Sequence, residues 1–437
     1  MPRVLIDCSY IDFARQPTGI PRVVLKYIEV GYDWGRERGV EVVPVVPSAE
    51  GLFLCRPVPG ANAPPDLAEK AERSWLMPRG QGRAPRGSGL ISPGIEPGPG
   101  DILFAPSYWH DVDPAIYRAI RRKGARIAIL VHDILPVEHP AFYQAPWRYR
   151  FEANLIHAIR GSDALFCVSR TTRRAVEAFA DRRGLTPPPV VTAYNGFDPL
   201  VSRRHAAQIR AGKIEPRITD GEAVRVLKDR QPLLMVGSIE PKKGHIPVLQ
   251  CLEAMWAAGY ERELIIIGRP GWLEGEVVEF IESSPFFGRR LFWLSGIDDF
   301  DLAYAYIGCR ALIFASLAEG FGIPMIEASH FGKPVIVYDT PIAREVLAGV
   351  GRFFGDAASL VRALLELEMA ETYSALRAAA ERFTWPTWDE YSPAVFDELM
   401  KLLDGRTLAD VIERKPSSAA FHPEPPRHEP ASGAVHV

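Results

Sequence analysis

The stretch "EGFGIPMIE" places two carboxylates, Glu319 and Glu327, at the ends of a glycine-rich turn. Gly320 and Gly322 allow backbone N–H groups to approach a ligand closely, and Pro324 favours the first turn of a helix. A helix N-terminus attracts an anion, whereas two carboxylates repel it unless they bind its hydroxyls. The combination indicates a ligand with phosphates and sugar hydroxyls. By itself, the stretch also fits a helix cap with solvated glutamates.

Alternating strand and helix signals surround this turn. The strand-like run "ALIFAS" precedes it, and a second strand, "PVIVYD", follows the helix. The same alternation begins at "RVLIDCSY" near the N-terminus and restarts at "PLLMVGSI" after a polar stretch at residues 199–230. Repeated strand–helix units predict a parallel sheet covered by helices, here in two copies. Ligands bind such sheets at the carboxyl ends of the strands, where the two glutamates are expected.

We therefore expect an α/β protein with two doubly wound domains. The expected boundaries are residues 1–200 for the first domain, 201–230 for a linker, 231–384 for the second domain, 385–412 for a C-terminal helix and 413–437 for a tail. The tail contains Pro, Ser and His without apolar periodicity, which predicts disorder. Residues 56–100 are rich in Pro and Gly, and we expect a long loop or a partly ordered flap there.

The composition, 47% hydrophobic and 24% charged, is that of a soluble globular protein. We find no signal peptide and no apolar run long enough to span a bilayer. Five scattered cysteines without a CxxC pair indicate reduced thiols in a cytoplasmic protein. Residues 1–204 contain 27 Lys and Arg against 21 Asp and Glu, a net charge of +6. These basic clusters are either solvated helix faces or a surface for an anionic membrane or a phosphate-bearing acceptor, and no nucleic-acid-binding motif accompanies them.

The stretch from Glu319 to Glu327 resembles the E-x7-E signature of the retaining glycosyltransferases of family four. Other segments resemble the same family across residues 3–400. They are "PTGIPRV" (its first glycine-rich loop), "VHDILPVEHP" (its histidine loop), "CVSRTT" (its serine turn), "NGFD" (its NG(V/I)D turn), "MVGSIEPKKGH" (its donor loop) and "RFTWPTW" (its crossing to the first domain). The resemblance implies a GT-B fold, in which two Rossmann-like domains face a central cleft and the C-terminal helix returns to the first domain.

The resemblance also implies a role for each matching residue. Lys243 would hold the donor diphosphate, Glu319 would bind hydroxyls of the transferred sugar, and His132 would hydrogen-bond that sugar from the first domain. These three residues form the expected catalytic group, and Glu327 would bind the ribose hydroxyls of the nucleotide. Further donor-binding residues are expected to be Gly19, Ser238, Lys242, Gly320, Phe321, Gly322 and Ile323.

One departure from the family pattern is Ser238, which stands where many members carry a phosphate-binding arginine. Lys242 would supply that charge, as in the subgroup with mannosyl- and rhamnosyltransferases of bacterial surface polysaccharides. The implied reaction is transfer of a sugar with retention, without metal or cofactor, and GDP-mannose is the favoured donor. The acceptor would be a glycan or a polyprenyl-diphosphate-linked glycan, with the enzyme in the cytoplasm and peripheral to the inner membrane face.

Two alternatives stay open at this point. A nucleotide-sugar epimerase of the same fold would consume its substrate without any acceptor. A non-catalytic relative would bind nucleotide sugars or glycans, and we would expect it to have lost Glu319, Glu327 or Lys243. All three residues are present, which favours a transferase.

Overall fold

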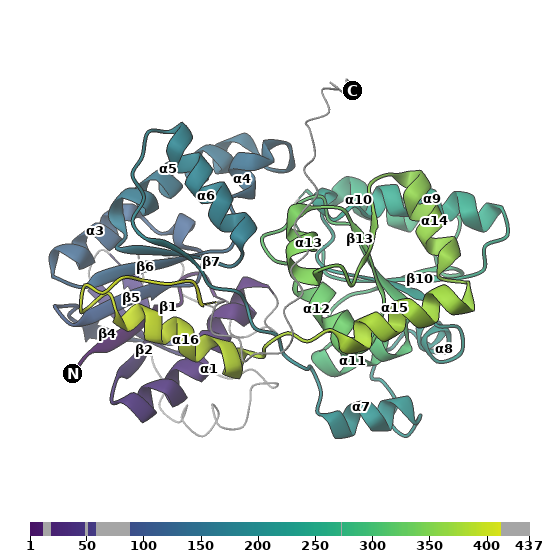
Figure 1. Cartoon of the computed structure of the whole chain (residues 1–437), viewed down its shortest axis with the longest axis horizontal. Coiled ribbons are helices and arrows are strands. Elements are labelled where there is room, and N and C mark those ends of the chain that lie inside the picture. The colour runs from purple at the N-terminus through teal and green to yellow at the C-terminus, as the bar shows by residue number, and fades with distance from the viewer. Residues whose placement is uncertain (12–18, 49–50, 58–87, 272, 412–437) are drawn as a thin grey trace.

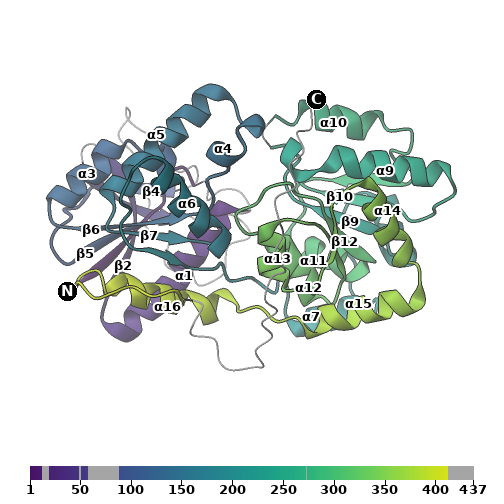
Figure 2. The ribbon, with the colours of Figure 1, turned by 45° about the horizontal axis from the view of Figure 1, so that its top comes forward.

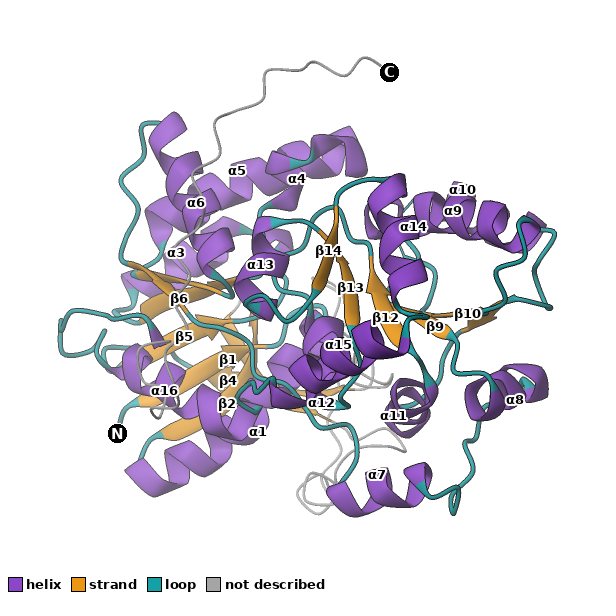
Figure 3. Ribbon diagram, turned by 45° about the vertical axis from the view of Figure 1, so that its right-hand side comes forward, coloured by secondary structure: helices purple, strands orange, loops and turns teal. Residues whose placement is uncertain are grey.

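The structure is a computed structural model that describes residues 1–11, 19–48, 51–57, 88–271 and 273–411. Two layered α/β units lie side by side, each with a central sheet between helices (Figures 1 and 3). Most of the flap expected within residues 56–100, together with all of the tail expected at residues 413–437, lies outside the described residues.

The first unit contains an eight-stranded sheet in the order β4-β3-β2-β1-β5-β6-β7-β8. Its strands are β1 (Arg3–Asp7), β2 (Glu41–Ser48), β3 (Gly51–Pro57), β4 (Ser88–Ile95), β5 (Asp101–Ala105), β6 (Arg126–Val131), β7 (Ala164–Cys167) and β8 (Val190–Thr192). All neighbours pair in parallel except β3, which runs antiparallel to both β2 and β4. Of the long loop or partly ordered flap expected at residues 56–100, residues 56–57 and 88–95 thus belong to strands that the sequence analysis did not predict. Proline and glycine conceal a strand signal, yet the edge of a sheet tolerates them.

Helices cover both faces of the first sheet. Their bounds are α1 (Ile20–Arg38), η1 (Trp109–Asp111), α3 (Pro114–Arg122), α4 (Leu135–Glu138), η2 (Pro140–Phe142), α5 (Ala145–Gly161) and α6 (Arg170–Arg182). Buried side chains of α3, α5 and α6 pack together on one face, and α1 packs on the other. The carboxyl ends of β5 and β6 are left for loops, including the one that carries His132.

The second unit contains a parallel sheet in the order β11-β10-β9-β12-β13-β14. Its strands are β9 (Leu233–Val236), β10 (Leu264–Ile267), β11 (Leu291–Leu294), β12 (Ala311–Phe314), β13 (Val335–Tyr338) and β14 (Arg352–Phe354). The strand order reverses between β9 and β12, and ligands bind doubly wound sheets at such a switch point. The loop after β9 leads to Lys243, and the loop after β12 carries Glu319, so topology alone makes these two residues neighbours.

Helices of the second unit also form two layers. Their bounds are α7 (Arg203–Arg210), α8 (Gly221–Asp229), η3 (Pro241–Lys243), α9 (His245–Ala257), α10 (Gly275–Ser283), α11 (Asp299–Gly308), α12 (Ile323–His330), α13 (Pro341–Leu347), α14 (Ala357–Glu366) and α15 (Ala370–Arg382). α9, α10 and α14 pack on one face of the sheet, and α11 and α12 on the other. The segment expected to be a linker contains α7 and α8, both of which pack against α11.

The C-terminal helix α16 (Trp388–Met400) returns to the first unit and lies along α1 (Figure 2). Phe396 stacks on Trp34 with ring centroids 5.0 Å apart, and Trp388 meets Tyr27 edge-on at 5.8 Å. A Cβ on Gly196 would lie only 2.5 Å from the backbone nitrogen of Trp388, so the crossing chain requires glycine there. The return of the C-terminal helix expected from the family resemblance is confirmed.

One buried apolar cluster continues from the first unit into the second. At the junction, Phe321 lies 6.0 Å from Tyr194 and 5.6 Å from Trp385, measured between ring centroids. The two units therefore touch through buried aromatic rings directly beside Glu319. Among the described helices, none is both long enough and apolar enough to cross a membrane.

Candidate active site

The turn between β12 and α12 forms the centre of the candidate site. Gly322 has a φ of 95°, a conformation that favours glycine, and it precedes the first turn of α12. A Cβ on Gly320 would lie 1.8 Å from the carbonyl oxygen of His132, so the bare backbone allows the two units to meet here. Within the described chain, the N–H groups of residues 320–323 have no hydrogen-bond acceptor. They are available to an anion at the helix N-terminus.

Lys243 and Glu319 form an ion pair at this turn. Their side chains are only 16% and 13% exposed. Burial by itself would raise the pKa of Glu319, but the charges of Lys243 and Lys242 outweigh it and bring the pKa below its usual value of 4.5. Glu319 is therefore ionised at neutral pH. Lys243 contributes a positive charge beside the turn whose N–H groups, at residues 320–323, have no acceptor within the described chain.

The Lys242 side chain lies between its own donor loop and the first unit. Its Nζ lies 3.4 Å from the hydroxyl of Tyr143 and 3.5 Å from the Glu240 carboxylate. Burial lowers the pKa of Lys242, yet nearby negative charges, led by Glu319, raise it overall. Ser238 donates a 2.6 Å hydrogen bond to Glu240. Lys242 therefore places a second cation near Glu319, whereas Ser238 fixes the carboxylate of its own loop.

His132 approaches the turn from the first unit. Its Nε2 lies 2.7 Å from the carbonyl oxygen of Pro106, so this nitrogen carries the proton and Nδ1 is an acceptor. Burial lowers the pKa of His132 below 6.5, and the ring is neutral at pH 7. The hydroxyl of Thr172 lies 3.4 Å from the carbonyl oxygens of both His132 and Gly320. The histidine loop and the glutamate loop thus meet across the two units.

Glu327 has partners that the sequence did not predict. One carboxylate oxygen accepts a 3.0 Å bond from Arg22, and the other accepts a 2.9 Å bond from the hydroxyl of Tyr306. Burial raises the pKa of Glu327 above 4.5, although Arg22 and Tyr306 oppose the shift. Arg22 belongs to α1 and follows Gly19 by three residues. Its position inside "PTGIPRV", a segment already singled out by its glycine, is the signal that could have identified it.

The remaining expected donor residues lie near the turn or at the start of α1. Gly19 precedes α1 with a φ of 60°, and residues 12–18 of its loop lie outside the described chain. Phe321 is buried at the aromatic junction, and Ile323 is the first residue of α12. Both are placed to offer backbone N–H groups rather than side chains. The structure therefore gathers Lys242, Lys243, His132 and Glu319 with the α12 N-terminus and gives Glu327 a partner from α1.

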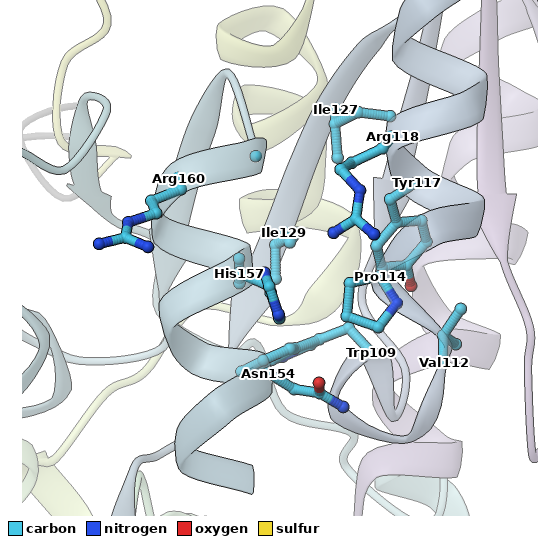
Figure 4. A pocket seen from close by; sticks show the side chains of 12 residues that line it. Trp109, Val112, Pro114, Tyr117, Arg118, Ile127, Ile129, Asn154, His157 and Arg160 are labelled. Carbon is cyan, nitrogen blue, oxygen red and sulfur yellow. The ribbon is translucent and has the colours of Figure 1, made fainter. Parts of the chain in front are cut away.

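A separate cavity of about 220 Å³ lies in the first unit between α3, α5 and β6. Trp109 and Ile129 belong to its apolar lining, and Arg118, His157 and Arg160 come from the two helices that border it (Figure 4). None of the residues expected to bind a donor lines this cavity. It is therefore distinct from the cluster around Glu319.

Two family models match the chain. The model described as Glycosyltransferase Family 4 matches residues 34–199, and the model described as Glycosyl transferases group 1 matches residues 219–381. The serotype-specific mannosyltransferase WbdA of Escherichia coli is 32% identical over 299 residues, which are 66% of this chain and 36% of that protein. The O-antigen chain mannosyltransferase RfbU of Salmonella typhimurium is 23% identical over 222 residues, 50% of this chain and 54% of RfbU. The match thus spans about a third of the length of WbdA.

Solved structures share the arrangement of the two units. Sucrose-phosphate synthase from Thermosynechococcus elongatus has a TM-score of 0.59 at 15% identity and covers 93% of this chain and 100% of its own. HepE of Anabaena, in complex with UDP-glucose, has a TM-score of 0.53 at 15% identity over 94% of this chain and 98% of its own. At these identities the likeness establishes the fold. The expected GT-B architecture is confirmed.

Proposed function

The chain belongs to the glycosyltransferases of family 4 and group 1, and from this premise we propose that it transfers mannose from GDP-mannose to a glycan with retention of the anomeric configuration. The names of its relatives WbdA and RfbU, both mannosyltransferases, support the choice of sugar. The observation that carries the proposal is the Lys243–Glu319 ion pair at the turn before α12, where the N–H groups of residues 320–323 have no acceptor among the described residues. The lysine and the helix N-terminus suit a diphosphate, and the carboxylate suits the hydroxyls of a sugar.

In the proposed reaction, the enzyme acts through positioning and charge. The diphosphate takes Lys243 as its partner, and the N–H groups of residues 320–323 stabilise the charge that develops as it leaves. Glu319 is then free to accept hydrogen bonds from sugar hydroxyls. His132 offers a neutral Nδ1 to the same sugar from the first unit. This division of roles holds the sugar between two units that already touch at Gly320.

We propose that no protein carboxylate attacks the sugar. The bond to the leaving phosphate breaks and the bond to the acceptor oxygen forms on the same face, while the phosphate takes the acceptor's proton. In this scheme Glu319 accepts hydrogen bonds from sugar hydroxyls and forms no bond to the anomeric carbon. Trapping of a glycosyl adduct on Glu319 would contradict the proposal. The reaction needs neither metal nor cofactor in this scheme, and we expect full activity in excess EDTA.

The proposed acceptor is a phosphate-bearing glycan, such as one linked to polyprenyl diphosphate. Support comes from the net charge of +6 within residues 1–204, which would attract such an acceptor or an anionic membrane face. This would place the enzyme in the cytoplasm, in peripheral contact with the inner membrane. Sedimentation with anionic but not neutral vesicles, weakened by salt, would test the contact.

Thermal stability with GDP, UDP, dTDP or ADP tests the donor site. A nucleotide present at a hundred times its dissociation constant adds roughly 2.7 kcal/mol to the free energy of unfolding. We expect GDP to stabilise the wild type selectively and to stabilise Glu327→Ala much less, each compared with its own ligand-free state. If none of the four nucleotides stabilises the wild type, the proposed donor site is wrong.

Product analysis tests the reaction itself. With GDP-mannose and a mannose-terminated glycan, we expect an α-linked product in the anomeric NMR spectrum, as retention requires. Consumption of the nucleotide sugar at the same rate without acceptor, with a new nucleotide sugar as product, would instead identify an epimerase.

A further inference from the structure

Arg22 joins the two units at a buried position. It lies near the start of α1 in the first unit, and its guanidinium contacts Glu327 on α12 and Asp299 on α11 in the second. The side chains of Arg22 and Glu327 are 11% and 3% exposed. The chain between these two residues spans 305 positions, so the contact depends entirely on how the units dock. Buried ion pairs of this kind are costly to break by removal of one partner.

The contact closes off the Glu327 carboxylate. One of its oxygens accepts from Arg22 and the other from Tyr306, and almost no carboxylate surface is left for a ligand. Asp299, in contrast, is 43% exposed, and it forms a second ion pair with Arg22. Arg22 therefore has a second carboxylate within reach in the same docked arrangement.

We propose that Arg22 is a gate residue that occupies Glu327 until the vicinal hydroxyls of a nucleotide's ribose displace it. This inference rests on the proposed function, because it takes Glu327 as the ribose-binding carboxylate of the donor site. On binding, Glu327 exchanges one guanidinium hydrogen bond for hydroxyl hydrogen bonds, and Arg22 keeps its bond to Asp299. Entry of the donor thereby releases one of the contacts that hold the two units together.

The proposal has a consequence for affinity. A protein whose binding-competent state is only fractionally populated shows an apparent affinity reduced by that fraction. Weakening the hold of Arg22 on Glu327 should therefore tighten nucleotide binding. Arg22→Gln removes the charge yet keeps a hydrogen-bond donor, and Arg22→Lys keeps the charge.

The test is calorimetric titration of the full chain with GDP and with 2′,3′-dideoxy-GDP. For Arg22→Gln we expect the dissociation constant of GDP to fall about tenfold. For dideoxy-GDP, which has no hydroxyls to offer Glu327, we expect wild type and variant to bind alike. Arg22→Lys should restore wild-type behaviour. Arg217→Gln is the matched control, because Arg217 pairs with Asp298 at the same end of α11 but is 74% exposed.

The outcomes separate the gate from the donor site. GDP binding by Arg22→Gln that is equal to or weaker than wild type overturns the gate while leaving the donor site in place. A tenfold gain that also appears with dideoxy-GDP overturns it too, since the effect is then unrelated to the ribose hydroxyls. Failure of every protein to bind GDP overturns the proposed donor and, with it, the gate.

Discussion

At the scale of single residues, the site is defined by charges that neutralise one another. Glu319 sits between Lys243 and Lys242, and Glu327 sits against Arg22. The lysines lower the pKa of Glu319, whereas burial keeps that of Glu327 raised. The pKa values of the two glutamates thus shift in opposite directions, because the groups around each carboxylate differ. The cations beside Glu319 belong to the second unit, whereas Arg22, the cation paired with Glu327, comes from the first.

The depressed pKa of Glu319 has a consequence for stability. Its ion pair with Lys243 stabilises the fold fully above the unfolded pKa of 4.5, and this contribution is lost as pH falls through the lower folded pKa. We expect Lys243→Met to destabilise the protein at pH 7 and to cost progressively less as the pH falls below 4.5. Urea unfolding from pH 7 to pH 3.5 measures this. A difference that does not shrink in acid, or that persists in a Glu319→Gln background, would contradict the assignment.

At the scale of elements, the position of the site follows from two loops of different units that touch backbone to backbone. The carbonyl of His132, after β6, lies where a side chain on Gly320, after β12, would have to go. Glycine at residue 320 therefore serves the approach of the loops rather than the flexibility of the turn. Thr172 at the start of α6 lies near both carbonyls and completes this contact.

Gly320→Ala tests the contact between the loops. Its Cβ would overlap the His132 carbonyl at 1.8 Å, and the loops must separate to admit it. Because a displacement of about 1 Å at a reacting centre costs on the order of 100-fold in rate, we expect a loss of that size in sugar transfer. Gly355→Ala, where an added Cβ meets nothing within 4 Å, is the control. An active Gly320→Ala enzyme with unchanged kinetics would show that the loops separate during catalysis.

At the scale of the whole molecule, a second carboxylate ties the units together. Glu345 on α13 accepts hydrogen bonds from the N–H groups of Arg170 and Thr171 at 2.6 and 2.8 Å, and from the hydroxyls of Thr171 and Tyr194. It therefore caps α6 of the first unit from the second unit. An anion at a helix N-terminus is favoured by the exposed N–H groups and by the helix dipole. Unlike the Arg22 contact, this one does not involve a residue of the expected donor site.

Glu345→Ala should loosen the docking of the two units. The change leaves two N–H groups and two hydroxyls without their acceptor, at a cost of about 1–3 kcal/mol for each group that stays buried. We expect a larger radius of gyration in small-angle scattering and a lower melting temperature. Glu366→Ala is the control, because Glu366 pairs with Arg352 inside the second unit. Equal scattering curves for both variants and the wild type would assign Glu345 no part in docking.

The sequence by itself determined the alternation of strands and helices, the two α/β domains, and the residues of the turn at Glu319. These features depend on local patterns: apolar runs of strand length, glycines where the backbone turns, and proline at a helix start. The pairing of β3 with β4 was missed because Pro and Gly obscure strand signals at a sheet edge. Lys243 and His132 were predicted as site residues from the family resemblance of the short motifs that contain them.

Only the tertiary structure decided which of these residues contact one another and which further residues contact them. The strand order places Lys243 beside Glu319, and docking of the units brings His132 to Gly320. The same docking gives Glu327 the partner Arg22, which no local pattern connects to it. Contacts between separately folded layers depend on the shape and charge of whole surfaces. Residues far apart in the chain form these surfaces together, so local sequence patterns do not predict the contacts.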